Sequence, residues 1–178
     1  MAVKNEFFKS KLFYFLSLVF IIYFCNSIQG VFLAQMSSSW FHIDLVSIII
    51  VYLCIEHHVL LAATLAVVAG NLMQATVTSP HVFFVLYFLF LFVLSNIISN
   101  FFVLSSLISK SIIFTVLYLS KYILFYFSLT NRYEIGLSPL FSVYWKEFIA
   151  TAVCSFFVFQ LLYYFDSLFM LPGTIKKR

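Results

Sequence analysis

The chain has 178 residues, of which 64% are hydrophobic and 9% are charged, and its formal net charge is +4. A water-soluble domain of this length needs a charged and polar surface, which six acidic and ten basic residues do not supply. The composition therefore excludes a soluble globular protein. With 4 Gly and 3 Pro residues it also argues against a disordered chain.

In hydrocarbon the backbone must satisfy its own hydrogen bonds, so only helices and closed barrels cross a bilayer. The apolar runs are long and continuous, unlike the alternating segments of a barrel. We therefore predict a single all-α domain over residues 1–178, an integral membrane bundle of about six transmembrane helices. At about 20 residues per crossing, the predicted helices cover residues 12–33, 43–55, 59–77, 82–104, 107–129 and 143–171.

Polar stretches separate these helices. The first helix follows three lysines, but its apolar run is too long for a signal peptide, so we expect it to be retained. Glu56-His57-His58 is predicted to be a solvated turn, because adjacent histidines point apart on a helix and do not match zinc spacings. Residues 130–134 are predicted to be a polar loop, with Gly136 and Pro139 as breakers before the last helix.

The basic residues predict the orientation of the bundle. Six helices place seven basic residues on one face, namely Lys4, Lys9, Lys11, Lys110, Lys176, Lys177 and Arg178. Arg132 and Lys146 belong to the opposite face, where the aromatic anchors Trp40, Tyr133, Tyr144 and Trp145 are also expected. By the positive-inside rule both termini are cytoplasmic. This small basic excess is a topology signal and not a nucleic-acid surface.

Small residues follow one face of the third predicted helix at four-residue spacing: Ala62, Ala66 and Gly70. In lipid such a stripe lets a second helix approach closely. The stripe predicts packing within the chain's own bundle or, alternatively, a docking face for a partner subunit.

Amide side chains follow on the third and fourth helices: Asn71, Gln74, Asn96 and Asn100. Polar groups in lipid need hydrogen-bond partners, so these residues predict contacts between helices. The alternative is a solute site with an aromatic wall.

Two charged residues inside apolar runs, Lys121 and Glu147, have similar expected depths below the outer ends of the last two helices. We hypothesise an ion pair between them. The alternative is that Lys121 extends its ammonium group to the outer interface.

Catalytic motifs are missing from the sequence, which has no Gly-x-Ser-x-Gly, His-Glu-x-x-His or Gly-x-x-x-x-Gly-Lys. We expect no enzyme activity, no cofactor and no metal site.

Residues 44–98 resemble the rod shape-determining MreD family. Asp44 opens the second helix and Tyr52 follows in its hydrophobic run, as is typical of the family. Gly70 matches a glycine of the next helix, whereas Gln74 stands where the family usually has an aspartate. Phe83 and Phe84 stand where the family usually has a glycine.

The resemblance implies a non-catalytic scaffold in the bacterial inner membrane that supports rod shape and side-wall peptidoglycan synthesis. Its partners would be membrane lipids and MreC-like, RodA-like and elongation transpeptidase proteins. The alternative is the substrate-binding subunit of an energy-coupling-factor vitamin transporter, which would use Trp40, Asn71, Gln74 and Asn96 to hold its ligand.

Overall fold

The computed structural model describes residues 2–33, 43–76, 83–102, 104, 106–133 and 137–169. Every secondary-structure element of more than one residue in these ranges is a helix, which confirms the predicted all-α class for them. In chain order the elements are α1 (Ala2–Ser27), the π-helical turn η1 (Ile28–Leu33), α2 (Leu45–Glu56), α3 (Val59–Thr76), α4 (Phe83–Phe101), α5 (Leu107–Tyr133) and α6 (Leu137–Phe169).

Five of these helices contain a segment long and apolar enough to cross a membrane. The segments are Lys11–Gly30, Val59–Thr76, Phe83–Phe101, Leu107–Leu124 and Trp145–Phe169. The chain thus has the helices of a multi-pass membrane protein. The sixth apolar helix, α2, has only 12 residues, about 18 Å at the rise of an α-helix, and is short for a crossing of its own.

At three points the helices extend beyond the predicted membrane segments. The first helix already begins at Ala2 and carries the lysines ahead of the apolar run. The fifth helix continues to Tyr133, so residues 130–133 are helical where a loop was expected. The last helix begins at Leu137, and Pro139 lies in its first turn. Proline is tolerated there because the first amides of a helix have no partner within the helix.

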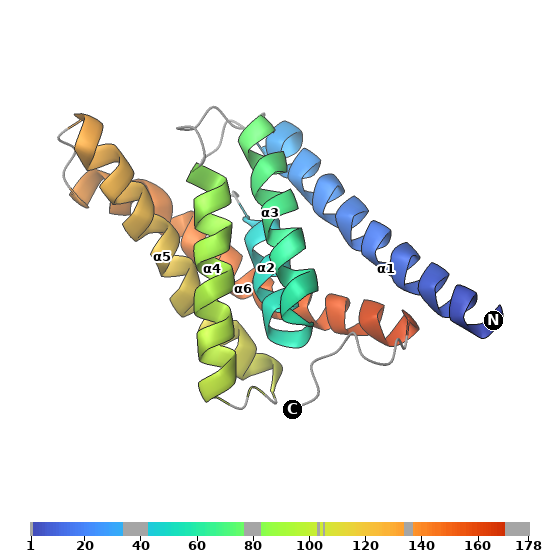
Figure 1. Cartoon of the computed structure of the whole chain (residues 1–178). Coiled ribbons are helices and arrows are strands. Elements are labelled where there is room, and N and C mark those ends of the chain that lie inside the picture. The colour runs from blue at the N-terminus through green and yellow to red at the C-terminus, as the bar shows by residue number, and fades with distance from the viewer. Residues whose placement is uncertain are drawn as a thin grey trace.

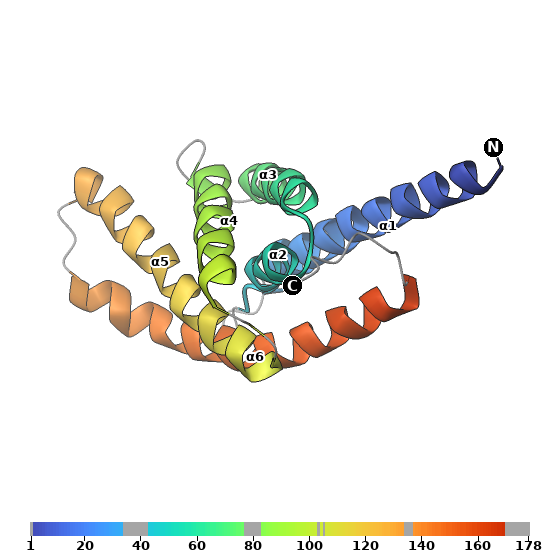
Figure 2. The same ribbon diagram turned by 60° about the horizontal axis from the view of Figure 1, so that its bottom comes forward.

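The helices surround α2 (Figures 1 and 2). Successive helices run in alternating directions, so α1 begins and α6 ends at the same side of the bundle, the lower side in Figure 1. From Val46 to Ile55, no side chain of α2 is more than 2% exposed. A helix that is apolar all round is a buried helix, and α2 fills the centre of this bundle.

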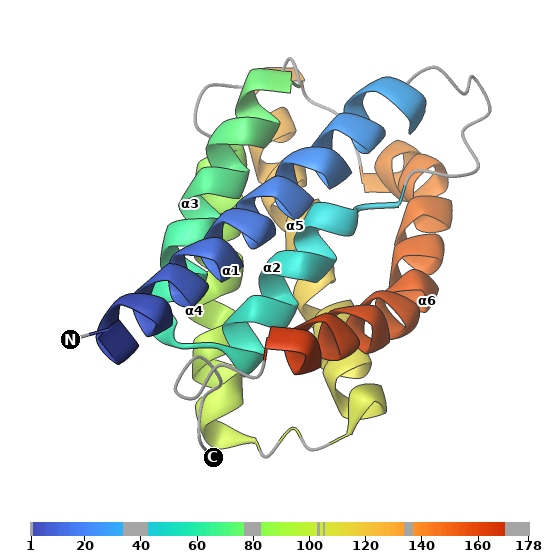
Figure 3. The ribbon, with the colours of Figure 1, turned by 90° about the vertical axis from the view of Figure 1, so that its right-hand side faces the viewer.

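The last helix changes direction along its length. In Figures 1 and 3, two views at right angles, α3 runs up the page while the red end of α6 runs across it. The chain beyond α6 and the predicted anchor Trp40 lie outside the described residues, as do the side chains of Lys4, Lys9, Arg132, Tyr133 and Tyr144.

The small-residue stripe of α3 is used inside the bundle. Ala62 and Ala66 are fully buried, and a Cβ atom added to Gly70 would lie 2.7 Å from the Cα atom of Val85 in α4. The stripe therefore allows α3 and α4 to pack backbone to backbone. A partner subunit cannot dock on it without separating these two helices.

We predict that Gly70→Ala destabilises the protein. The added methyl group meets backbone atoms of α4, and such overpacking costs about 1–3 kcal/mol, more than the gain in helix propensity. The midpoint of thermal unfolding in detergent measures the effect. Gly30→Ala is the control, because its Cβ would make an ordinary 3.8 Å contact with Thr76. Equal midpoints for the two variants would contradict this account of the α3–α4 contact.

Candidate functional site

Polar side chains gather at both ends of the buried helix α2. All four acidic residues whose side chains the structure describes lie there, each against a basic side chain. Asp44 and Glu147 contact Lys121, Glu56 contacts Lys110, and Asp166 contacts His57. In the apolar interior of a bundle an unpaired charge is costly, so these pairs allow the acids to be there.

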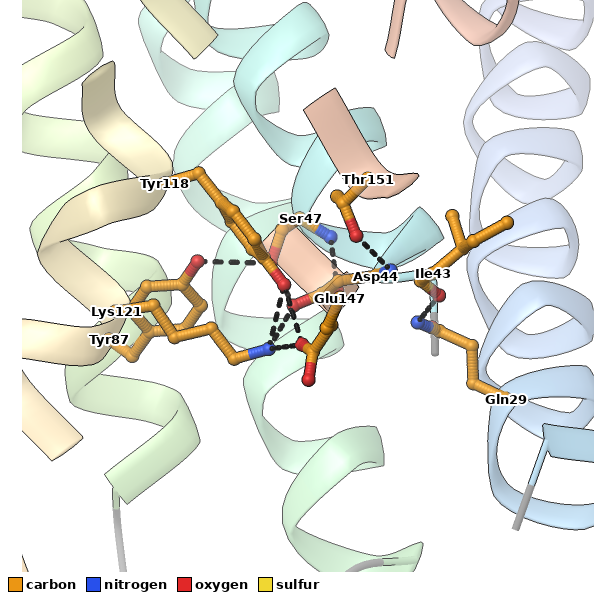
Figure 4. A network of polar contacts seen from close by, with 9 residues as sticks. All are labelled: Gln29, Ile43, Asp44, Ser47, Tyr87, Tyr118, Lys121, Glu147 and Thr151. Carbon is orange, nitrogen blue, oxygen red and sulfur yellow. Dashed lines mark hydrogen bonds and ion pairs between the residues drawn. The ribbon is translucent and has the colours of Figure 1, made fainter. Parts of the chain in front are cut away.

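The first cluster begins with the residue that caps α2 (Figure 4). Asp44 accepts hydrogen bonds from the backbone amide of Ser47 at 3.0 Å and from its hydroxyl at 2.8 Å. This is an N-cap, which satisfies amides that the first turn of a helix leaves without partners. The backbone amide of Asp44 donates to the Thr151 hydroxyl of α6 at 3.1 Å. The cap thereby joins α2 to α6.

Lys121 of α5 lies between two carboxylates. Its ammonium group is 2.7 Å from Asp44 and 2.9 Å from Glu147, and it also donates to the Tyr118 hydroxyl at 3.1 Å. Tyr118 in turn donates to Glu147 at 2.7 Å. Lys121 and the hydrogen bonds from Ser47 together compensate the charge of the buried Asp44 carboxylate.

A third helix joins this cluster through Tyr87 of α4, whose hydroxyl is 3.1 Å from that of Ser47. Because the Ser47 proton is directed to Asp44, Tyr87 is the donor in this contact. On the other side, Gln29 donates to the backbone carbonyl of Ile43 at 2.7 Å. One set of contacts therefore connects α2 with η1, α4, α5 and α6 (Figure 4).

The second cluster closes the other end of α2. Asp166 of α6 accepts hydrogen bonds from the hydroxyls of Tyr14 at 2.6 Å and Tyr52 at 2.7 Å. The same carboxylate lies 2.9 Å from Nε2 of His57, which is 1% exposed. The predicted solvated turn at Glu56-His57-His58 is thus wrong for His57, and only His58 of the three is exposed.

Lys110, counted above among the basic residues of the cytoplasmic face, is also buried. Its ammonium group is 2.5 Å from the Glu56 carboxylate. Lys110 and Lys121 are about three helical turns apart, so both lie on one face of α5. Their partners Glu56 and Asp44 bracket α2, which runs antiparallel to α5.

The structure brings together the two residues that the depth argument paired, Lys121 and Glu147. Asp44, which was not predicted as a partner, is held by the same ammonium group. A signal for it was present in the sequence. Two acids lie at the ends of one short apolar helix, and two lysines lie three turns apart on another. The spacing of the acids matches the spacing of the lysines.

Three of the predicted amide residues bond to backbone groups. Asn71 and Asn96 donate to carbonyls one turn earlier in their own helices, at 2.8 Å and 2.9 Å. Gln74 accepts from the backbone amide of Phe84 at 3.3 Å and so links α3 to the first turn of α4. Asn100 is exposed near the end of α4. Gln74 thus makes one of the predicted contacts between helices. The bonds of Asn71 and Asn96 each stay within the residue's own helix.

The chemistry of the two clusters is that of buried ion pairs and hydrogen bonds. Among the described residues, no three His, Cys, Asp or Glu side chains are grouped so that they could hold a metal ion. Comparison with known proteins yields no match to a family model, a curated protein or a solved structure.

We predict that Lys121→Met destabilises the protein by about 3–5 kcal/mol, because it leaves two carboxylates facing each other in the bundle. Glu147→Gln removes one charge and keeps both Asp44 and Lys121, so its effect should be smaller. The measurement is thermal unfolding in detergent. An unchanged melting curve for Glu147→Gln would refute a contribution of this pair to stability.

A double-mutant cycle isolates the contact between the two residues. Lys121→Met combined with Glu147→Gln should be less destabilising than the sum of the single changes, because the second change removes one of the stranded carboxylates. Strict additivity would contradict the pairing.

Proposed function

We propose that this chain is a non-catalytic scaffold of the MreD kind in the bacterial inner membrane, with both termini in the cytoplasm. In this role it supports rod shape and side-wall peptidoglycan synthesis through helix contacts with MreC-like, RodA-like and elongation transpeptidase proteins. The proposal begins from the sequence resemblance over residues 44–98.

The observation that carries the proposal is the structural role of the residues on which the resemblance rests. Asp44 caps α2 and binds Lys121, Tyr52 donates to Asp166, and Gly70 forms the close contact with α4. Each of them holds the buried helix or its neighbours in place. Such residues are expected in a protein whose task is to present a fixed membrane surface to partners.

The course of the helices supports the proposed orientation of the chain in the membrane. Because α1 begins and α6 ends at one side of the bundle (Figure 1), the proposal assigns both termini to the same side of the membrane. Lys11 and the basic tail at residues 176–178 favour the cytoplasm for that side.

The vitamin-transporter alternative has less support. Of the residues it would use, Asn71 and Asn96 are bonded to their own helices, and Gln74 is bonded to the start of α4. In addition, α2 occupies the centre of the bundle, where a solute between the helices would have to lie.

Depletion of the protein in its native bacterium tests the proposal. We expect rod-shaped cells to become round and the incorporation of a fluorescent cell-wall precursor along the side wall to fall, with restoration by the intact chain supplied from a plasmid. Lys121→Met, supplied in the same way, should restore shape poorly, while Asn71→Ala should restore it fully. Cells that keep their shape but lose vitamin uptake would reverse the choice between the two functions.

A further inference from the structure

The last helix is longer than one crossing of a membrane requires. With 33 residues α6 extends about 50 Å, whereas about 20 residues cross the hydrocarbon core. Hydropathy alone places a span over Trp145–Phe169. Residues 137–156 already have the length of a crossing, so the rest of α6 is free to follow another course.

That course is visible in the figures. The red end of α6 runs across the direction of α3 in both Figure 1 and Figure 3, and in Figure 3 it ends beside the lower end of α2. Asp166 fixes this segment there through its bonds to His57, Tyr14 and Tyr52. The ring of Phe169 adds a contact with Tyr14, with ring centres 5.2 Å apart.

An apolar ridge lies on the outer face of the same segment. Phe157, Leu161, Tyr164 and Leu168 follow one another at spacings of four, three and four residues, which form a single stripe on a helix. They are exposed to almost the same extent, at 64%, 67%, 66% and 64%. The adjacent Tyr163 is also exposed, whereas the acid of this segment, Asp166, is buried.

We propose that α6 crosses the membrane with residues 137–156 and that residues 157–169 lie along the boundary between lipid headgroups and acyl chains. The ridge of Phe157, Leu161, Tyr164 and Leu168 is then an interaction surface for lipid. Helices that lie in this boundary bury one apolar face, and tyrosine is enriched at that depth. The polar pair Glu56–Lys110, at the lower end of α2, lies at the same side of the bundle.

Charge also favours lipid at this surface. The exposed side chains of the segment include no acid, and the chain continues to Lys176, Lys177 and Arg178, which are attracted to anionic headgroups.

Spin labels placed along the ridge measure its orientation in the bilayer. Single cysteines replace Phe157, Leu161, Tyr164 or Leu168 in full-length protein in lipid nanodiscs. Cys25 and Cys154 are changed to alanine, and Cys54 is kept because it is fully buried. Only variants that retain the parent melting curve are used. Collision rates with oxygen and with a water-soluble nickel chelate report the depth of each label.

Helix α4 provides a matched control. Leu86, Phe90, Val93 and Ile97 have the same spacing and are also exposed. Labels along α4 should differ in depth by up to about 16 Å from first to last, whereas the four labels on α6 should share one depth near the headgroups.

A depth gradient along α6 like that of α4 would overturn the proposal and make the whole of α6 a transmembrane helix. Labels shielded from both collision reagents would also overturn it, because a second copy of the chain would then cover the ridge in place of lipid. Neither result depends on the proposed scaffold role.

Discussion

A short helix buried on every side is the constraint that organises this protein. Its ends carry backbone groups and charged residues that the apolar interior cannot satisfy, so neighbouring helices must supply the partners. Ser47, Thr151 and Lys121 do so around Asp44 at the N-terminal end. At the other end Lys110 binds Glu56, and Asp166 binds His57, the residue after α2. The two polar clusters follow directly from placing α2 in the centre.

The ion pairs determine register more than they add stability. A buried pair gains little over well-packed apolar side chains, but a charge left without its partner costs several kcal/mol. Because Lys110 and Lys121 lie on one face of α5, a shift of α2 along α5 breaks both pairs at once. The arrangement therefore selects one alignment of the two helices. A fixed alignment is what the proposed scaffold role would require.

Much of the fold was accessible from the sequence because long apolar runs in lipid have few alternatives to helices. The candidate site was accessible only in part. The similar expected depths of Lys121 and Glu147 in the membrane predicted their contact, because opposite charges in an apolar environment attract each other strongly. His57 was misplaced because a polar tripeptide between apolar runs is usually a solvated turn, and its partner Asp166 is more than a hundred residues away. The curved course of α6 has no local signal, because it depends on contacts with α1 and α2.

The most direct test of the central claim is an exchange of charges between Glu56 and Lys110. Glu56→Lys and Lys110→Glu should each lower the midpoint of thermal unfolding in lipid nanodiscs, because each places two like charges in contact. The double variant should regain the midpoint of the unaltered protein or exceed it, since a lysine then lies at the C-terminal end of α2 and a glutamate in the first turn of α5, where the helix dipoles favour them. A double variant as unstable as the sum of the two single changes would show that α2 is not held in place by this pair.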